Sequence, residues 1–121
     1  LAQEKVGCQY SQDLRYEEGY YDCSSLVQRC YAQFGVNLPS VASTQGQYIV
    51  DNGLQVSENE LRPGDLIFHA RDDNADEFMS IGHVAIYVGN GMQVDARGTA
   101  YGVVYRPLVP SNIGLYGRPC R

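Results

Sequence analysis

A cysteine stands at the start of an expected helix in the stretch GYYDCSSLVQRC, residues 19–30. Cys23 follows Asp22, a favourable N-cap residue, so the cysteine would lie in the first turn of that helix. The thiolate is the nucleophilic form, and a free cysteine, with a pKa of about 8.5, is mostly protonated at neutral pH. Unpaired N–H groups and the positive end of the helix dipole favour an anion here. The same N–H groups could hold the oxyanion of a tetrahedral intermediate.

On position alone, Cys23 fits a nucleophile and a buried core thiol equally well, because free cysteines are often buried. The apolar residues recur at the spacing of one helical face, namely Cys23, Leu26, Val27, Cys30, Tyr31 and Phe34. Gly35 and Pro39 predict the end of the helix. Cys30 lies two turns after Cys23, without the benefit of the helix dipole, and we interpret it as a core thiol.

A thiol nucleophile needs a proton acceptor, and the chain contains only two histidines, His69 and His83. His69 ends the apolar run of residues 66–70, next to an acidic loop at residues 71–80. His83 opens HVAIYVGNGMQVDA, which reads as two strands around a turn. Because a lone histidine is usually structural, the choice between the two depends on geometry.

The hairpin at residues 83–96 supplies that geometry. If residues 89–91 form a three-residue loop, Val88 pairs with Met92, and Tyr87 with Gln93. One face then carries mainly polar residues, namely His83, Ala85, Tyr87, Gln93, Asp95 and Arg97. The opposite face is wholly apolar, with Val84, Ile86, Val88, Met92, Val94 and Ala96. A two-residue turn would mix the two faces, so the clean separation favours the three-residue loop.

In this register His83 is the diagonal neighbour of Asp95, with Cα atoms about 7–8 Å apart. An aspartate beside an imidazole fixes its tautomer and stabilises the imidazolium. Cys23, His83 and Asp95 would then be nucleophile, base and orienting group. The alternative is that Asp95 is a solvated carboxylate, paired with Arg97 or unpaired.

The order of the expected elements indicates an α+β fold in one domain, residues 1–121. A helical turn at residues 43–50, ended by 51–53, follows the first helix. Strands are expected at residues 66–70, in the hairpin, and at 103–105 and 113–116. The acidic loop at 72–77 is more simply explained as solvated than as a contact for a partner.

Composition excludes several classes of protein. The net charge of −5 argues against binding to nucleic acid and against unaided adhesion to an anionic membrane or polymer. Such targeting would need another domain or a partner. No apolar run approaches the roughly 20 residues of a membrane-spanning helix. The chain starts at Leu1 without a visible secretion signal, and a start without methionine suggests a processed product or an excised domain.

The chain has four cysteines, which form no CxxC pair, so a zinc cluster is not expected. Cys8 and Cys120 lie near opposite ends, and chain ends often approach one another in a domain. Two alternatives stay open: the two cysteines form a disulfide, or both are reduced thiols. A disulfide would imply an oxidising compartment.

The blocks YDCSSLVQ, RPGDLIF and HVAIYVGNG, in this order, resemble the NlpC/P60 cell-wall peptidases, which are papain-like cysteine hydrolases. The opening YSQDLRYEEGYYDCSSLV is also similar to the amidase domains of phage lysins. The resemblance implies an N-terminal helix packed on a central antiparallel sheet, with Cys23 as nucleophile and His83 as base. Many members carry histidine at the position of Asp95, and a glycine at that of Ser25, so this chain departs from the commonest pattern. By the same resemblance Tyr10, Asp22 and Ser24 would contact substrate, the last two through its free amine.

The activity implied by the resemblance is hydrolysis of an amide in the peptide stem of bacterial peptidoglycan. A γ-D-glutamyl–diamino acid endopeptidase is expected, with no metal or organic cofactor, and a secreted or cell-envelope location. Two alternatives stay open: an N-acetylmuramoyl-L-alanine amidase, and a catalytically inert binding module with the same fold.

Overall fold

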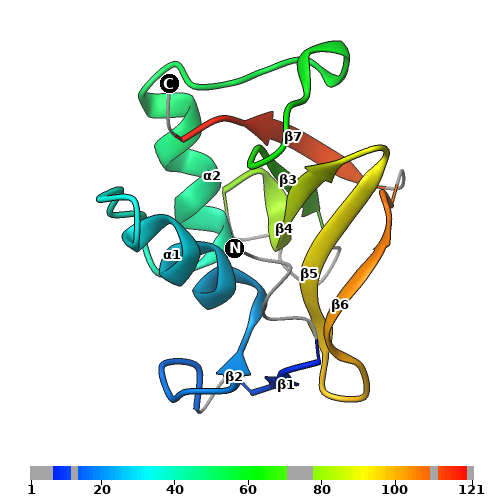
Figure 1. The fold of residues 1–121 in the computed structure, drawn as a ribbon. Coiled ribbons are helices and arrows are strands. Elements are labelled where there is room, and N and C mark those ends of the chain that lie inside the picture. Colours follow the sequence, from blue (N-terminus) through cyan, green and yellow to red (C-terminus); the bar gives the residue numbers. More distant parts are fainter. Residues whose placement is uncertain (1–6, 12–13, 71–77, 110–111, 120–121) are drawn as a thin grey trace.

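Two helices and a five-stranded antiparallel sheet form most of the computed structural model, in agreement with the predicted α+β class (Figure 1). The structure describes residues 7–11, 14–70, 78–109 and 112–119. In chain order the elements are β1 (Gln9–Tyr10), β2 (Tyr20–Tyr21), α1 (Cys23–Ala32), α2 (Ala42–Asp51), η2 (Glu58–Glu60), β3 (Leu66–Ala70), η4 (Phe78–Ser80), β4 (Ile81–Gly89), β5 (Met92–Gly98), β6 (Gly102–Pro107) and β7 (Ile113–Gly117).

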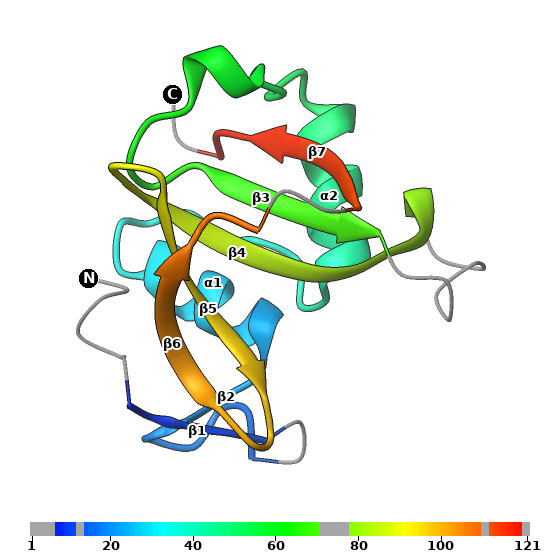
Figure 2. The ribbon, with the colours of Figure 1, turned by 90° about the vertical axis from the view of Figure 1, so that its right-hand side faces the viewer.

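The sheet has the strand order β6-β5-β4-β3-β7, and each neighbouring pair is antiparallel. Both helices lie on one face of it, and Figure 2 shows the sheet from the opposite side. The core between these layers is apolar, with Leu26 and Val27 from α1 and Ile49 from α2 fully buried against Phe68 and Val84. The expected strands at 66–70, 103–105 and 113–116 are confirmed as β3, β6 and β7.

Helix α1 begins at Cys23, as predicted. The Asp22 carboxylate accepts a hydrogen bond from the Ser25 backbone N–H, and the Ser25 hydroxyl accepts one from the Asp22 N–H, which forms a capping box. Gly35, at φ +78°, follows the end of the helix. The prediction for Phe34 is wrong: α1 ends at Ala32, so Phe34 leaves the helical face and is 68% exposed.

Helix α2 is longer than the turn predicted at residues 43–50, although it ends where expected. Gln45, on its buried side, donates to the carbonyls of Ser24 and Pro39, at 3.0 and 2.9 Å. These bonds connect the first turn of α1 to the segment that enters α2. The start of the helix that carries Cys23 is therefore held from outside as well as by its own cap.

The hairpin between β4 and β5 turns at two residues, Asn90 and Gly91, so the predicted three-residue loop is wrong. Both residues have positive φ, +56° and +73°, as a type I′ turn requires. Gly89 pairs with Met92, and Val88 is bulged out of the ladder. The bulge adds back the residue that the shorter turn removes, so the predicted pairing of Tyr87 with Gln93 is confirmed.

Strands β1 and β2 form a small parallel pair next to the turn of the β5–β6 hairpin (Figure 2). The Cys8 carbonyl accepts from the Val103 N–H, which joins this pair to β6. A Cβ on Gly102 would lie 2.2 Å from the same carbonyl, so only glycine allows this approach. The pairing holds Tyr10 beside Tyr21, two residues before Cys23.

Two predictions lie outside the described residues, the solvated acidic loop at 72–77 and the pairing of Cys8 with Cys120. Cys8, Cys23 and Cys30 take part in no disulfide within the described part of the chain. Among the residues that the structure describes, no helix is long and apolar enough to cross a membrane.

Candidate active site

Cys23 is the first residue of α1 and is only partly buried. Cys30, one of the core residues, is buried as predicted. The two cysteines of α1 therefore differ in access and in their distance from the helix N-terminus. The cap at Asp22 and the bonds from Gln45 fix the first turn, and with it the direction in which Cys23 projects.

His83 and Asp95 form a short buried contact, with His83 Nε2 2.7 Å from Asp95 Oδ2. Because an ionised carboxylate only accepts hydrogen bonds, Nε2 must donate. The contact joins β4 to β5, as the diagonal relationship in the predicted register requires. The alternative pairing of Asp95 with Arg97 is not present: Arg97 lies over the ring of Tyr101, 3.9 Å from its centroid.

Two residues for which the sequence predicted no role complete the surroundings of Asp95. Arg106, on β6, donates from Nε to Oδ1 at 3.0 Å and from Nη2 to Oδ2 at 2.6 Å. Gln93 donates to Oδ1 at 3.1 Å and accepts from the Val109 backbone N–H. Arg106 lies directly opposite Gln93 across the β5–β6 ladder, on the face that carries Asp95. The pairing register of β6 was the missing signal, because without it no sequence pattern connects Arg106 to Asp95.

These contacts determine the charges in the site. Burial lowers the pKa of His83, but the hydrogen bond to Asp95 and the interaction with Cys23 outweigh burial and raise this pKa to about 9. Burial also acts to raise the pKa of Asp95, yet the hydrogen bonds from His83 and Arg106 hold it well below its usual range. The pair is therefore an imidazolium and a carboxylate at neutral pH.

The thiol of Cys23 interacts with the imidazole of His83. Since Asp95 occupies Nε2, the ring nitrogen left for the sulfur is Nδ1. The structure thus brings together the three residues expected to act as nucleophile, base and orienting group.

His69, the other candidate base, lies directly opposite His83 in the β3–β4 ladder. The centroids of the two rings are 5.8 Å apart, and the rings are tilted by 40°. The contacts with both Cys23 and Asp95 belong to His83. The geometry therefore favours His83 as the base and makes His69 its neighbour.

Of the residues expected to contact substrate, Asp22 and Ser24 flank Cys23 and already contact other side chains. Asp22 and Ser24 are both buried, and Arg15 contacts the two of them. Tyr10 is half-buried on β1 and packs against the core. No pattern in the sequence connects Arg15 with Asp22, because the contact depends on how residues 14–19 fold back over α1.

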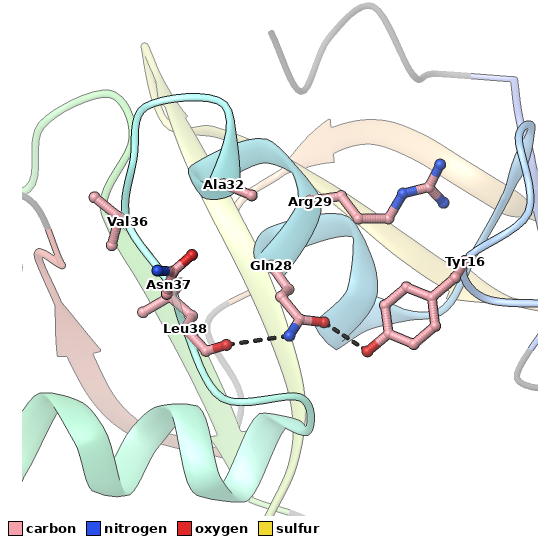
Figure 3. Close-up of a pocket in the computed structure, with 7 residues that line it drawn as sticks. All are labelled: Tyr16, Gln28, Arg29, Ala32, Val36, Asn37 and Leu38. Atoms are coloured by element: carbon pink, nitrogen blue, oxygen red, sulfur yellow. Dashed lines mark hydrogen bonds between the residues drawn. The ribbon is translucent and has the colours of Figure 1, made fainter.

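A shallow pocket of about 260 Å³ lies against the outer side of α1 (Figure 3). Its lining consists of Tyr16, Gln28, Arg29, Ala32, Val36, Asn37 and Leu38. Gln28 spans it, accepting from the Tyr16 hydroxyl at 2.7 Å and donating to the Leu38 carbonyl at 3.1 Å. Cys23, His83 and Asp95 are not part of the lining, so this pocket is separate from the candidate active site.

The arrangement has the components of covalent acyl transfer. It holds a partly exposed cysteine at a helix N-terminus, an imidazole beside it, and a buried carboxylate behind the imidazole. The backbone N–H groups of the first turn of α1 point toward the same end of the helix and can stabilise an oxyanion.

Comparison with known proteins finds similarity over most of the chain. A profile described as NlpC/P60 family matches residues 8–113. The probable endopeptidase p60 of Listeria seeligeri is 36% identical over 96 residues, which cover 79% of this chain and 16% of that protein. The peptidoglycan DL-endopeptidase CwlO of Bacillus licheniformis is 42% identical over 71 residues, which cover 59% of this chain and 14% of that protein.

A solved structure, NlpC1 from Trichomonas vaginalis, is similar over 98% of this chain and 41% of its own, with a TM-score of 0.83 and 29% identity. The chain therefore spans less than half of that chain and a much smaller part of the two curated relatives.

Proposed function

Because this chain belongs to the NlpC/P60 family, we propose that it is a cysteine hydrolase that cleaves an amide bond in the peptide stem of bacterial peptidoglycan. The observation that carries the proposal is the contact of Cys23, at the start of α1, with a His83 that is held by Asp95. The bond we propose is the one between γ-D-glutamate and the diamino acid. The name of CwlO, a DL-endopeptidase, supports this choice.

In the first half of the reaction, the Cys23 sulfur attacks the carbonyl carbon of the γ-D-glutamyl amide. The carbonyl oxygen becomes an oxyanion, which backbone N–H groups of the first turn of α1 stabilise. The imidazolium of His83 donates its proton to the leaving amine, and the carbon–nitrogen bond breaks. The products are a free diamino acid amine and a thioester on Cys23.

In the second half, the neutral imidazole takes a proton from water, which attacks the thioester and releases the acid and the Cys23 thiolate, so the imidazolium is restored. Asp95 holds Nε2 throughout, so Nδ1 stays directed at the reacting atoms. Arg106 and Gln93 hold the carboxylate in turn and complete its hydrogen bonds. No step in this scheme calls on a metal or an organic cofactor.

A substrate in the cell wall implies a secreted or cell-envelope enzyme. The net charge of −5 disfavours direct attraction to an anionic wall polymer, so we propose that another domain or a partner brings this catalytic domain to its substrate.

A second activity, N-acetylmuramoyl-L-alanine amidase, is favoured by one observation, the opening block with Arg15 that is similar to phage-lysin amidases. Digestion of purified peptidoglycan and mass spectrometry of the products would test both activities. A dipeptide that ends in D-glutamate supports the endopeptidase, whereas a new free amine on L-alanine supports the amidase. Intact muropeptides after digestion with folded protein would contradict both and favour the inert module.

A further inference from the structure

Gln93 lies between the candidate catalytic carboxylate and the segment that follows β6. It is completely buried on β5, two residues before Asp95 and on the same face of the sheet. Its Nε2 donates to Asp95 Oδ1 at 3.1 Å, and its Oε1 accepts from the Val109 backbone N–H at 3.1 Å. The Leu108 N–H donates to the Gly91 carbonyl at 2.8 Å, so two consecutive bonds hold this segment beside the start of β5.

The two ends of the Gln93 amide have fixed roles. A backbone N–H only donates, so the atom that faces Val109 must be the amide oxygen. An ionised carboxylate only accepts, so the atom that faces Asp95 must be the amide nitrogen. Both requirements are met in a single orientation of the amide. The Val109 N–H therefore determines that Gln93 donates to Asp95.

The Asp95 carboxylate uses its full capacity to accept hydrogen bonds, which is about four. Oδ1 accepts from Gln93 and from Arg106 Nε. Oδ2 accepts from His83 and from Arg106 Nη2. Without Gln93, Arg106 alone would hold Oδ1, and this buried oxygen would keep an unsatisfied lone pair. Gln93 thus completes the contacts that hold the carboxylate in one rotation.

We propose that Gln93 is a positioning residue for the reaction: it fixes Oδ1 of Asp95 and thereby presents Oδ2 to His83, while the Val109 N–H fixes Gln93. The inference rests on the proposed function. A continuous series of contacts then runs from Val109 through Gln93, Asp95 and His83 to Cys23. Because Gln93 is completely buried, it acts through Asp95 and not on the substrate.

Gln93→Met tests this role, because methionine has a similar length but no donor. The loss of one hydrogen bond to a charged group should lower kcat on a synthetic stem peptide about tenfold, with little change in KM. Gln47→Met, at an exposed position on α2, is the matched control and should leave kcat unchanged. Circular dichroism would verify that each variant is folded. An unchanged kcat in folded Gln93→Met overturns the inference.

A double-mutant cycle shows whether the effect passes through Asp95. In an Asp95→Asn background, Gln93→Met should change kcat by less than about twofold, because the group through which Gln93 acts has already been replaced. A second tenfold loss in that background would mean that Gln93 acts independently of Asp95, and the inference would be wrong.

The Nε2 proton of His83 gives a readout that needs no turnover. In protein with isotopically labelled histidine, the wild type should show a sharp downfield NMR signal for this proton, because the carboxylate holds it. Gln93→Met should broaden the signal, and Gln47→Met should not. A sharp, unshifted signal in folded Gln93→Met overturns the inference. Broadening in a protein whose wild type cleaves no stem peptide would support the positioning of Asp95 and contradict the proposed function alone.

The role of the Val109 N–H is tested by a pair of substitutions at that position. Val109→Pro removes the N–H donor, whereas Val109→Ala keeps it. Val109→Pro should broaden the His83 signal, because the amide of Gln93 is then free to turn, and Val109→Ala should leave the signal sharp. Identical His83 signals in the two folded variants would overturn the part of the proposal that assigns the orientation of Gln93 to Val109.

Discussion

His83 Nε2 lies 2.7 Å from Asp95 Oδ2, and this carboxylate is completely buried. Arg106 and Gln93 donate to the same carboxylate, so a buried negative charge is balanced by an imidazolium and a guanidinium. Buried charges are tolerated only when they are paired and hydrogen-bonded. The site therefore holds His83 in one orientation and one charge state before substrate arrives.

Replacing Asp95 with asparagine should test the orienting role. The Asp95→Asn side chain would keep the shape of the carboxylate but lose its negative charge. The imidazolium would then be less stable, and the tautomer of the neutral imidazole would no longer be fixed. We expect kcat to fall by at least about a hundredfold while the domain remains folded. Steady-state hydrolysis of a synthetic stem peptide, with circular dichroism as the check on folding, measures this. Asp51→Asn, at an exposed position, is the matched control, and full activity in Asp95→Asn would show that the orienting role is wrong.

The two histidines can be separated by matched substitutions. His83→Ala should abolish hydrolysis, because it removes the group that contacts both Cys23 and Asp95. His69→Ala should keep most of the activity, because His69 is a neighbour of the base and not its substitute. The measurement is kcat/KM for each folded variant on the same peptide. The reverse order of activities would transfer the role of base to His69.

Arg106 should act through Asp95 and not on the substrate. Arg106→Gln removes two charge-assisted hydrogen bonds from Asp95, so the carboxylate should hold His83 less firmly. It also removes a positive charge next to the imidazolium, so the pKa of His83 should rise. We expect kcat to fall by about tenfold with little change in KM, and Arg106→Lys to recover part of the loss. NMR titration of the His83 ring gives a readout that a purely structural role would not move. Arg97→Gln serves as control, and an unshifted titration in Arg106→Gln argues against positioning.

The raised pKa of His83 predicts how stability depends on pH. Below pH 6.5 the ring is protonated in both the folded and the unfolded chain, so the stabilising effect of its contacts is fully present. As the pH rises from 6.5 toward about 9, the unfolded chain loses this proton first, and the stabilisation is lost. The free energy of unfolding should then fall by up to about 1.4 kcal/mol per pH unit.

Urea denaturation across this pH range measures the decline. His83→Gln, which cannot titrate, should lack that component of the decline. If the wild type and His83→Gln show the same pH dependence, His83 does not have the raised pKa on which the proposed charge state depends.

Local patterns were sufficient to predict much of this fold. The spacing of apolar residues and the cap at Asp22 identified α1, and the alternation along residues 83–96 brought His83 near Asp95. The hairpin shows the limit of such patterns: the pairing of Tyr87 with Gln93 was right, but the turn has two residues and a bulge restores the register. The alternation of polar and apolar residues determines which faces of the two strands must match. A three-residue loop and a two-residue turn with a bulge both satisfy this condition.

The contacts that Arg15 and Arg106 make could not be predicted from the sequence. Arg15 meets Asp22 because a loop folds over α1, and Arg106 meets Asp95 because β6 pairs with β5 in one particular register. Each contact depends on tertiary structure and leaves no periodic signal. Phe34 was misplaced for a related reason, since the apolar pattern continued past the residue at which α1 ends.

Peptidoglycan digestion by two matched cysteine variants tests the central proposal most directly. Cys23→Ser and Cys30→Ser each replace one sulfur of α1 with oxygen, at the start of the helix and in the core respectively. We predict that Cys23→Ser releases no muropeptide fragments, while folded Cys30→Ser releases the same fragments as the wild type. Release of those fragments by Cys23→Ser at the wild-type rate would contradict the assignment of Cys23 as the nucleophile.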